Sequence, residues 1–315
     1  MLNWQTLSGL LISLACLAYV LNDVDFGQLW GLIRGLNWFY ALAVNGLLAL
    51  SFWSRSARWR LLLAPIKDCR LGGLWDANLI GFMANNVLPA RLGEFVRAFT
   101  AQQLTGVPAS SALATIVVER ILDGLTLLLI LFATLLFADP AATAGAFSVG
   151  YMRGAGFTLL AGYLVVLAVL FALWRWPTAT MGTLCRLAAR LSPKLGNALE
   201  GILALFHQGL TVLGHTHHLP RLVLFTLGTW VPMLLEYWVF LPATGLPLSL
   251  FLACMWAMMM AGAGQQAAAN FALLFWAVQY FPLTAAGLIT MWRRGLTLHG
   301  LRQAQETVPV QGKQP

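Results

Sequence analysis

Charge is scarce in this chain: Asp, Glu, Lys and Arg make up 10% of its 315 residues, and only 11 residues are acidic. Soluble domains carry roughly 25% charged residues. So few charges cannot cover the surface of a water-soluble protein of this length, whereas hydrophobic residues make up 59% of the chain. The scarcity excludes an ordinary soluble domain and predicts that many apolar side chains face lipid.

Short segments that alternate apolar and polar residues, the pattern of a membrane barrel, are lacking as well. The apolar residues form long unbroken runs, which predict helices, and helices satisfy their own backbone polar groups in lipid. We therefore expect an all-α, polytopic integral membrane protein. A span needs roughly 20 apolar residues, with about 17 as a lower limit. The runs that meet this need are 4–21, 36–53, 121–138, 157–176, 219–241 and 284–300.

Patterns for metal, cofactor and nucleotide binding are also missing. The four cysteines are scattered without metal-ligand spacing, so we expect no disulfide framework and no zinc site. There is no P-loop and no pairing of a nucleophile with a base. We expect no cofactor, no metal site and no catalytic activity of its own. The run at 7–21 lacks a basic segment before it and a cleavage site after it, so it is expected to be a retained span.

The charges that are present leave the chain at +8 and lie between apolar runs. This placement favours anionic lipid headgroups over nucleic acid as the partner. Lys and Arg concentrate in 54–70, in 175–218 and at the C-terminus, and cytoplasmic loops are the ones enriched in these residues. Both termini are therefore expected in the cytoplasm, with 139–156 on the opposite side. Within 175–218, the stretch 178–210 is expected to form an amphipathic interfacial helix.

Two further apolar regions, 71–118 and 249–281, are interrupted by polar and helix-breaking residues. With the topology above, each enters and leaves on one side, as the paired re-entrant segments of an inverted repeat do. That arrangement points to a substrate site near the midplane; two ordinary kinked hairpins are the alternative. We expect a single transmembrane domain over 1–302 and a polar, disordered tail over 303–315.

The densest charges in an apolar setting lie between 91 and 123. Glu94 and Arg97 are three residues apart, and Glu119 and Asp123 are four apart, so each pair shares a helix face, with Arg120 available to either acid. Such charges beside a span are costly unless paired or hydrated. A buried salt-bridge network with a purely structural role is one interpretation. A site for an anionic lipid headgroup is the other, and the two are compatible.

The start of this segment favours the lipid site. Pro89 suits the first turn of a helix, so a helix is expected to restart near it, with Asn85 and Asn86 as caps or amide donors. A helix N-terminus beside Arg91 attracts a phosphate. Farther along, Glu236 lies in an apolar run and is either a functional acid or a group hydrated at the membrane surface.

The sequence Asn-Val-Leu-Pro-Ala-Arg-Leu-Gly-Glu-Phe-Val-Arg at 86–97, followed by Val-Glu-Arg-Ile-Leu-Asp at 118–123, resembles the lysylphosphatidylglycerol synthase transmembrane family, also called the flippase-like domain family. The Ala-Arg-Trp-Arg-Leu-Leu-Leu stretch at 57–63 matches another element of that family. The resemblance implies a bacterial inner-membrane domain that carries a modified phospholipid, here without the C-terminal soluble domain that attaches the amino acid in larger relatives. Residues 261–270 depart from the family pattern, since the prolines and the acid common there are missing.

We therefore expect a lipid translocase or lipid-transport protein for an anionic or aminoacylated phospholipid. The alternatives are a membrane-embedded transferase and a regulatory subunit of a separate lipid-modifying enzyme. The residues expected to bind the headgroup are Arg58, Arg60, Asn85, Asn86, Pro89, Arg91, Gly93, Glu94, Arg97 and Arg120. Those expected in proton coupling or in an ion-pair network are Glu119, Asp123 and Glu236.

Overall fold

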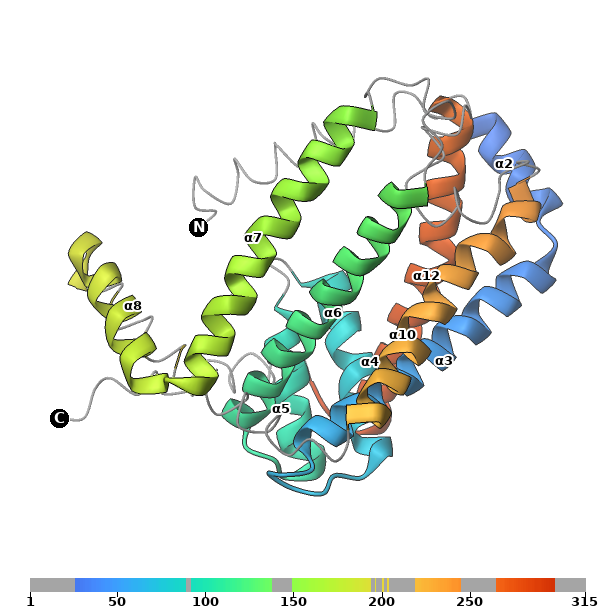
Figure 1. Ribbon diagram of the computed structural model, residues 1–315. Helices are drawn as coiled ribbons and strands as arrows, with labels where there is room; N and C mark the ends of the chain where they lie inside the picture. Colours follow the sequence, from blue (N-terminus) through green and yellow to red (C-terminus); the bar gives the residue numbers. More distant parts are fainter. Residues whose placement is uncertain are drawn as a thin grey trace, which may run out of the picture.

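The computed structural model describes residues 26–88, 92–137, 149–193, 196, 200, 203, 219–244 and 265–297. Every regular element in these ranges is helical (Figure 1), as expected for an all-α fold. The elements are α2 (Phe26–Gly35), α3 (Trp38–Leu63), α4 (Leu71–Val87), α5 (Gly93–Thr105), α6 (Ala109–Phe137), α7 (Val149–Arg175), α8 (Pro177–Leu191), α10 (Leu219–Phe240), η4 (Leu241–Thr244) and α12 (Gln265–Arg293).

The predicted spans correspond to these helices to different degrees. The run at 219–241 agrees closely with α10, whereas those at 36–53, 121–138 and 157–176 lie mostly within the longer helices α3, α6 and α7. The run at 4–21 lies outside the described residues. Within the described residues, Pro220–Phe240 and Asn270–Arg293 are long and apolar enough to cross a membrane. Six full spans therefore remain a prediction.

The predicted boundary between 249–281 and 284–300 was wrong, because α12 continues unbroken through Pro282 and ends at Arg293. A proline inside a helix leaves the carbonyl four residues earlier without its usual N–H partner, here that of Val278. Asn45 Nδ2 on α3 donates to this carbonyl at 3.2 Å. A neighbouring helix thus satisfies the freed group, which is how membrane helices tolerate proline. The part of the predicted broken region before Gln265 lies outside the described residues.

Helix α3 also contacts the second helix that contains a proline. Pro232 lies inside α10, and Ser51 Oγ on α3 donates to the carbonyl of Thr229 at 2.9 Å. Gly228 lets α10 approach closely, since a β-carbon there would lie 2.7 Å from Ser54 Oγ. Polar side chains of α3 therefore hold both proline-containing helices.

Helices α4 and α5 form an antiparallel hairpin. Gly81 of α4 lies against α5, where a β-carbon on it would lie 2.6 Å from Cβ of Arg97 and 3.0 Å from the carbonyl oxygen of Gly93. At the open end, Lys67 Nζ donates to the carbonyl of Gly106 at 3.3 Å. The chain thus enters and leaves the hairpin at the same end of the bundle, where α3 ends and α6 begins (Figure 1).

The closed end of the hairpin is fixed by hydrogen bonds. Asn85 Oδ1 accepts from the backbone N–H of Gly93 at 2.8 Å, at the first turn of α5. Asn86 Nδ2 donates to Thr284 Oγ1 of α12 at 2.9 Å, and Tyr280 of α12 donates to the Asn86 carbonyl at 2.7 Å. The described part of α5 begins at Gly93, later than the restart expected near residue 89. Asn85 therefore caps α5, and Asn86 ties the tip to α12.

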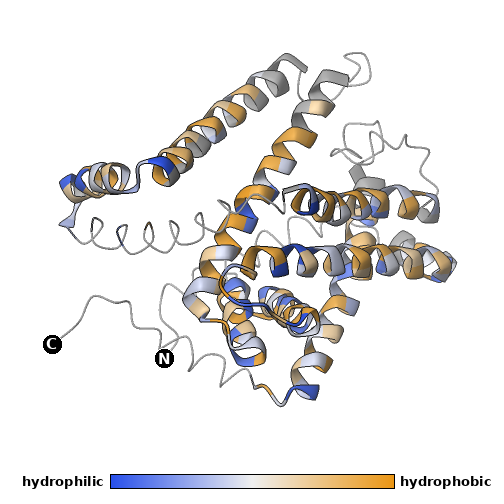
Figure 2. Cartoon of the chain, turned by 60° about the horizontal axis from the view of Figure 1, so that its bottom comes forward, coloured by the Kyte–Doolittle hydropathy of each residue, from blue (hydrophilic) through white to orange (hydrophobic). Residues whose placement is uncertain are grey.

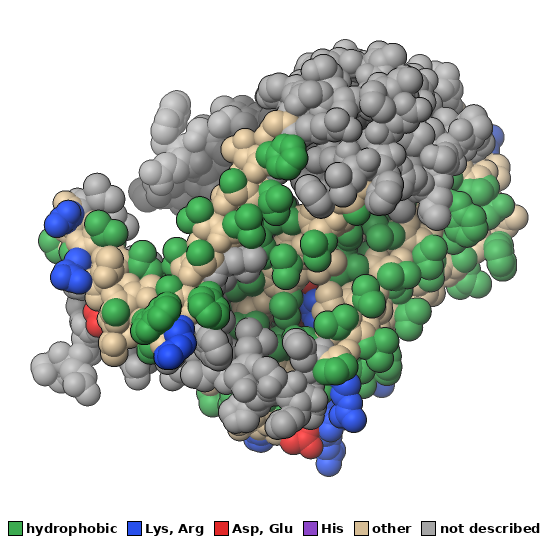
Figure 3. Space-filling view, in the orientation of Figure 1, with side chains coloured by type: hydrophobic (Ala, Val, Ile, Leu, Met, Phe, Trp, Pro, Cys, Tyr) green, Lys and Arg blue, Asp and Glu red, His purple; other side chains and the backbone are tan. Residues whose placement is uncertain are grey.

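Large apolar side chains are exposed along the long helices. Leu42, Leu129, Val165, Leu224 and Ile289, one from each of five helices, are all more than half exposed. Hydrophobic residues dominate these helices in Figure 2, and in Figure 3 they cover the visible outer faces, while many of the Lys and Arg side chains lie at the lower end and on α8. Soluble monomers rarely expose large continuous apolar surfaces. These faces therefore require an apolar surrounding.

Helix α8 turns away from α7 at Trp176 (Figure 1). Its apolar side chains, including Met181 and Leu184, pack against Leu173 at the end of α7. Arg186 and Arg190 are exposed. One face is thus apolar and the other basic, in line with an interfacial helix; most of the remainder of the predicted 178–210 stretch lies outside the described residues.

Candidate functional site

Five buried charged side chains meet where α3, α5 and α6 pack together. They are Arg55 and Arg58 from α3, Arg97 from α5, and Glu119 and Asp123 from α6, each no more than 5% exposed. Residues three or four apart share a helix face, so both arginines of α3 and both acids of α6 point the same way. Three cations against two anions leave this buried network with one net positive charge.

Glu119 is the centre of the network. Its Oε1 accepts from Arg55 Nη1 at 3.0 Å and lies 3.2 Å from Arg58 Nη2, and its Oε2 accepts from Arg97 Nη2 at 2.6 Å. Asp123 accepts from Arg58 Nη2 at 2.7 Å and from Arg55 Nη1 at 3.0 Å. Each carboxylate thus contacts at least two buried guanidinium groups. Three separate helices are held together by charge-assisted hydrogen bonds, which are stronger than neutral ones.

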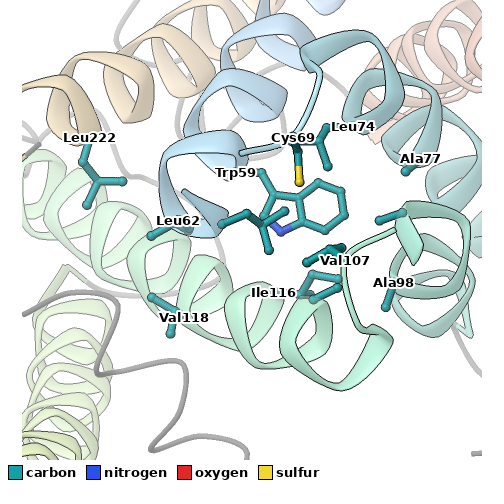
Figure 4. Close-up of a cluster of buried hydrophobic side chains, with 13 residues drawn as sticks. Trp59, Leu62, Cys69, Leu74, Ala77, Ala98, Val107, Ile116, Val118 and Leu222 are labelled. Carbon is teal, nitrogen blue, oxygen red and sulfur yellow. The ribbon is translucent and has the colours of Figure 1, made fainter. Parts of the chain in front are cut away.

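Aromatic rings support the guanidinium groups. The Cζ atom of Arg97 lies 3.9 Å from the ring centroid of Trp59, and that of Arg55 lies 5.4 Å from Phe82. Trp59 is itself fixed, because its Nε1 donates to Thr115 Oγ1 at 3.0 Å and its ring is surrounded by apolar side chains of the core (Figure 4). A cation over an aromatic face is stabilised most where water is excluded. The rings therefore favour a positive charge at this depth.

The network reaches the surface through two further side chains. Arg120 pairs with Glu94, and its Nη1 lies 3.5 Å from Asp123 Oδ2. Glu94 Oε2 lies 3.9 Å from Arg97 Nη1. The side chains of Arg120 and Glu94 are 41% and 28% exposed. This ion pair forms the accessible edge of an otherwise buried cluster.

Several buried polar atoms of the network have no hydrogen-bond partner among the described residues. They include Nε of Arg58 and both Nε and Nη1 of Arg97. Oγ1 of Thr100, one turn along α5 from Arg97, is also without one. A buried donor left without a partner costs about 1–3 kcal/mol. A net positive charge together with free guanidinium N–H groups provides the chemistry that binds an oxyanion such as a phosphate.

A sequence model of the lysylphosphatidylglycerol synthase TM region matches residues 6–266. The chain belongs to this family. The match covers most of the chain and includes every member of the charged network, and it confirms the resemblance carried by the motifs. Because the family domain is a transmembrane region, the chain is a membrane protein with a lipid-related role. Neither the curated proteins nor the solved structures contain a match to it.

The predicted charged residues of this family member do come together. Glu94, Arg97, Glu119, Arg120 and Asp123 all lie in one network, and for Glu119 and Asp123 the ion-pair interpretation fits the geometry. Arg97, Glu119 and Asp123 are buried and paired. Burial follows because three helices close over the carboxylates, leaving Glu94 and Arg120 at the edge.

Other predicted residues lie elsewhere. Arg60 is exposed and pairs with Asp68 at 3.0 Å, outside the network. Arg58 and Arg60 were both expected to bind the headgroup, but Arg58 is fully buried within the network whereas Arg60 is exposed. A step of two residues along a helix turns the direction of the side chain by about 200°. Arg58 therefore faces α6, and Arg60 faces away from it. Contacts within the hairpin and with α12 are made by Asn85, Asn86 and Gly93. Glu236 lies apart from the network, on α10. Pro89 and Arg91 lie outside the described residues.

Sequence reasoning missed Arg55. The basic stretch 54–70 was interpreted as a cytoplasmic loop, whereas α3 continues to Leu63. Arg55 and Arg58 are three residues apart, beside Trp59, in a stretch with no helix breaker before Pro65. That spacing was the available signal, since two arginines on one helix face require acidic partners when the helix is buried.

Proposed function

We propose that this membrane protein is a lipid translocase for an anionic or aminoacylated phospholipid, without catalytic activity of its own. The observation that carries the proposal is the buried network with one net positive charge, in which guanidinium N–H groups of Arg58 and Arg97 have no hydrogen-bond partner among the described residues. Guanidinium groups bind phosphate oxygens in a planar, two-pronged geometry. A phospholipid headgroup supplies both the charge and the acceptors that the site lacks.

The α4–α5 hairpin is, in this proposal, a re-entrant segment that places Arg97 within the bilayer of a bacterial inner membrane. Both of its ends lie at the end of the bundle where Lys67 and Arg60 are exposed. Basic residues are enriched on the cytoplasmic side, so this end faces the cytoplasm, as do both termini of a multi-pass chain. Irregular backbone at a hairpin tip is tolerated at membrane depth where protein buries it, and α12 contacts the closed end of α4 through Asn86.

A headgroup enters past the accessible edge formed by Glu94 and Arg120. An incoming phosphate competes with Glu94 for Arg120 and then meets Arg97, which lies 3.9 Å from the same carboxylate. Exchange of one anion for another keeps the guanidinium groups paired throughout, which avoids the cost of a bare buried charge. The partners in this proposal are membrane phospholipid and, for an aminoacylated lipid, a separate lipid-modifying enzyme.

Arg97→Gln is expected to slow lipid movement at least about tenfold, the effect of losing roughly 1.4 kcal/mol of stabilisation on the path. The change removes the net positive charge and the two donors of Arg97, yet leaves Glu119 with Arg55 and Arg58. The measurement is the transfer of a fluorescent phospholipid across proteoliposome membranes. Arg186→Gln, at an exposed arginine of α8, is the matched control and should leave the rate unchanged. A folded Arg97→Gln protein that moves lipid at the wild-type rate would rule out the headgroup role.

The topology is tested by single cysteines at Asp68 and Ser148, in a background lacking Cys16, Cys69, Cys185 and Cys254. Asp68 is well exposed at the open end of the hairpin, with a side chain 79% accessible. A hairpin that returns to its own side leaves one crossing, α6, between the two positions. An impermeant reagent outside intact cells should therefore label position 148 and spare position 68. Equal labelling of both positions means that the hairpin does not return, and the re-entrant arrangement fails.

A further inference from the structure

A second buried acid lies apart from the charged network. Glu236 on α10 is 1% exposed, and its Oε2 accepts a hydrogen bond from Gln279 Nε2 of α12 at 2.7 Å. Its Oε1 has no hydrogen-bond partner within the part of the chain that the structure describes. None of the ion pairs of that part includes Glu236. The carboxyl group therefore has one neutral amide as its polar partner there.

The groups around Glu236 are mostly apolar. An aromatic and aliphatic cluster, including Phe240, Leu274 and Phe275, lies one turn away along α10 and α12. The neighbouring helices carry the phenols of Tyr40 on α3, Tyr237 on α10 and Tyr280 on α12, and α2 carries the exposed Arg34, which lies over Trp30. The other cations of these helices lie farther along them: the arginines of α3 pair with Asp68 or with the acids of α6, and α10 and α12 carry theirs near one end, at Arg221 and Arg293. Phenols are uncharged at neutral pH. Nothing in this set neutralises a carboxylate at Glu236.

An ionised carboxylate buried without a cation costs several kcal/mol, whereas the protonated acid is uncharged and still accepts the amide hydrogen bond. The described surroundings of Glu236 thus favour a bound proton. Glu119 and Asp123 differ, because each forms ion pairs with at least two arginines. Of the three acids expected to take part in proton coupling, Glu236 alone has the surroundings of a group that takes up and releases a proton.

The position of Glu236 connects it to the hairpin. Gln279, its partner, is followed by Tyr280, whose hydroxyl donates to the carbonyl of Asn86 at the closed end of α4. On α10, Thr226 accepts from Arg58 Nη1 at 3.4 Å, and Glu236 lies ten residues farther along, about 15 Å away at 1.5 Å per residue. Pro232 interrupts the hydrogen-bond ladder between these two levels. The acid and the charged network therefore lie at different depths of the bundle and share α10 and the hairpin.

We propose that Glu236 is a proton-binding site through which lipid movement by this chain is coupled to the proton gradient across the membrane. The proposal rests on the lipid-translocase function and adds its energy source. The proton enters from the side of the membrane opposite the charged network and binds Oε1. It leaves when α12 and the hairpin tip shift and the carboxyl group meets water. Loss of the proton leaves an unpaired buried charge on Glu236. The ionised form is therefore short-lived unless the helices move.

The test compares lipid movement with and without an imposed pH gradient in proteoliposomes that contain a fluorescent phospholipid. A gradient of one pH unit should change the wild-type rate by up to about tenfold for one coupled proton. In Glu236→Gln, which mimics the uncharged acid, the rate should be the same with and without the gradient. Glu200→Gln makes the same chemical change at an exposed position and should keep the full response. Glu236→Asp, with a shorter acid, should keep a weakened response and serves if the amide variant does not fold.

A second measurement separates this inference from the function it rests on. The infrared spectrum of purified wild-type protein should contain a protonated-carboxyl band that shifts in heavy water and is missing in Glu236→Gln. Wild-type lipid movement that ignores the pH gradient, or follows a sodium gradient, overturns the coupling and leaves the translocase function standing. If no lipid moves at all, the translocase function fails, and the spectrum decides whether Glu236 binds a proton: the band supports the site and its absence overturns it.

Discussion

Glu119→Gln is expected to destabilise the folded protein by about 3–5 kcal/mol, the usual cost of breaking a buried ion pair by removing one partner. Glu119 contacts Arg55, Arg58 and Arg97 within 3.2 Å. The amide has nearly the same shape but no charge, so Arg55 and Arg58 share the carboxylate of Asp123, and Arg97 is left with the more distant Glu94 at 3.9 Å. Because these cations come from α3 and α5, the loss should loosen both helices from α6. The measurement is the midpoint of thermal or denaturant unfolding in detergent.

Two controls accompany this prediction. Asp68→Asn removes the partner of Arg60 from a pair whose side chains are 46% and 79% exposed, and exposed pairs contribute about 0–1 kcal/mol. The double variant Glu119→Gln/Arg97→Gln removes one cation along with the acid. It should be more stable than the sum of the single changes predicts, because fewer buried charges remain unpaired. A Glu119→Gln protein as stable as Asp68→Asn would show that the network contributes little to stability.

The sequence predicted which charged residues belong to the network better than it predicted how deeply they are buried. Helical spacing was enough to put Glu94 beside Arg97 and Glu119 beside Asp123, because neighbours on one helix are fixed by 3.6 residues per turn. Which charges meet between helices depends on packing that no local pattern encodes. The contact between Arg55 and Glu119 joins residues 64 positions apart. The basic stretch 54–70 was therefore assigned to a loop, although its first part belongs to α3 and carries the buried Arg55 and Arg58.

The C-terminal region illustrates the same limit for the fold. The division between 249–281 and 284–300 falls at Pro282, which does remove one backbone hydrogen bond although α12 continues through it. The group that compensates is the side chain of Asn45, separated from Val278 by 233 positions. The pattern of neighbouring residues reveals the proline, but it does not reveal the distant side chain that compensates for it. The hairpin was easier, because the polar and breaking residues at its tip mark a reversal whatever lies beside it, and Asn85 caps α5 within the same segment.

Gly93→Ala is expected to cost about 3 kcal/mol of stability, the upper part of the usual range for overpacking, and to abolish lipid movement in the protein that remains folded. A β-carbon on Gly93 would overlap the carbonyl oxygen of Gly81 and the side-chain amide of Asn85. The first of these is backbone, so relief requires α4 and α5 to move apart. The amide would also have to leave its bond to the Gly93 N–H. Both shifts displace Arg97, one turn farther along α5, from Glu119.

Gly72→Ala is the matched control, since it makes the same change on α4 at a position where a β-carbon meets nothing within 4 Å. There the higher helix propensity of alanine should leave stability unchanged or raise it by up to about 1 kcal/mol. Unfolding midpoints and lipid transfer are measured for both variants. A Gly81→Ala variant should resemble Gly93→Ala, because its β-carbon would lie 2.6 Å from Cβ of Arg97. If Gly93→Ala behaves like Gly72→Ala in both measurements, then α4 and α5 are not in close backbone contact, and the position of Arg97 does not depend on their crossing.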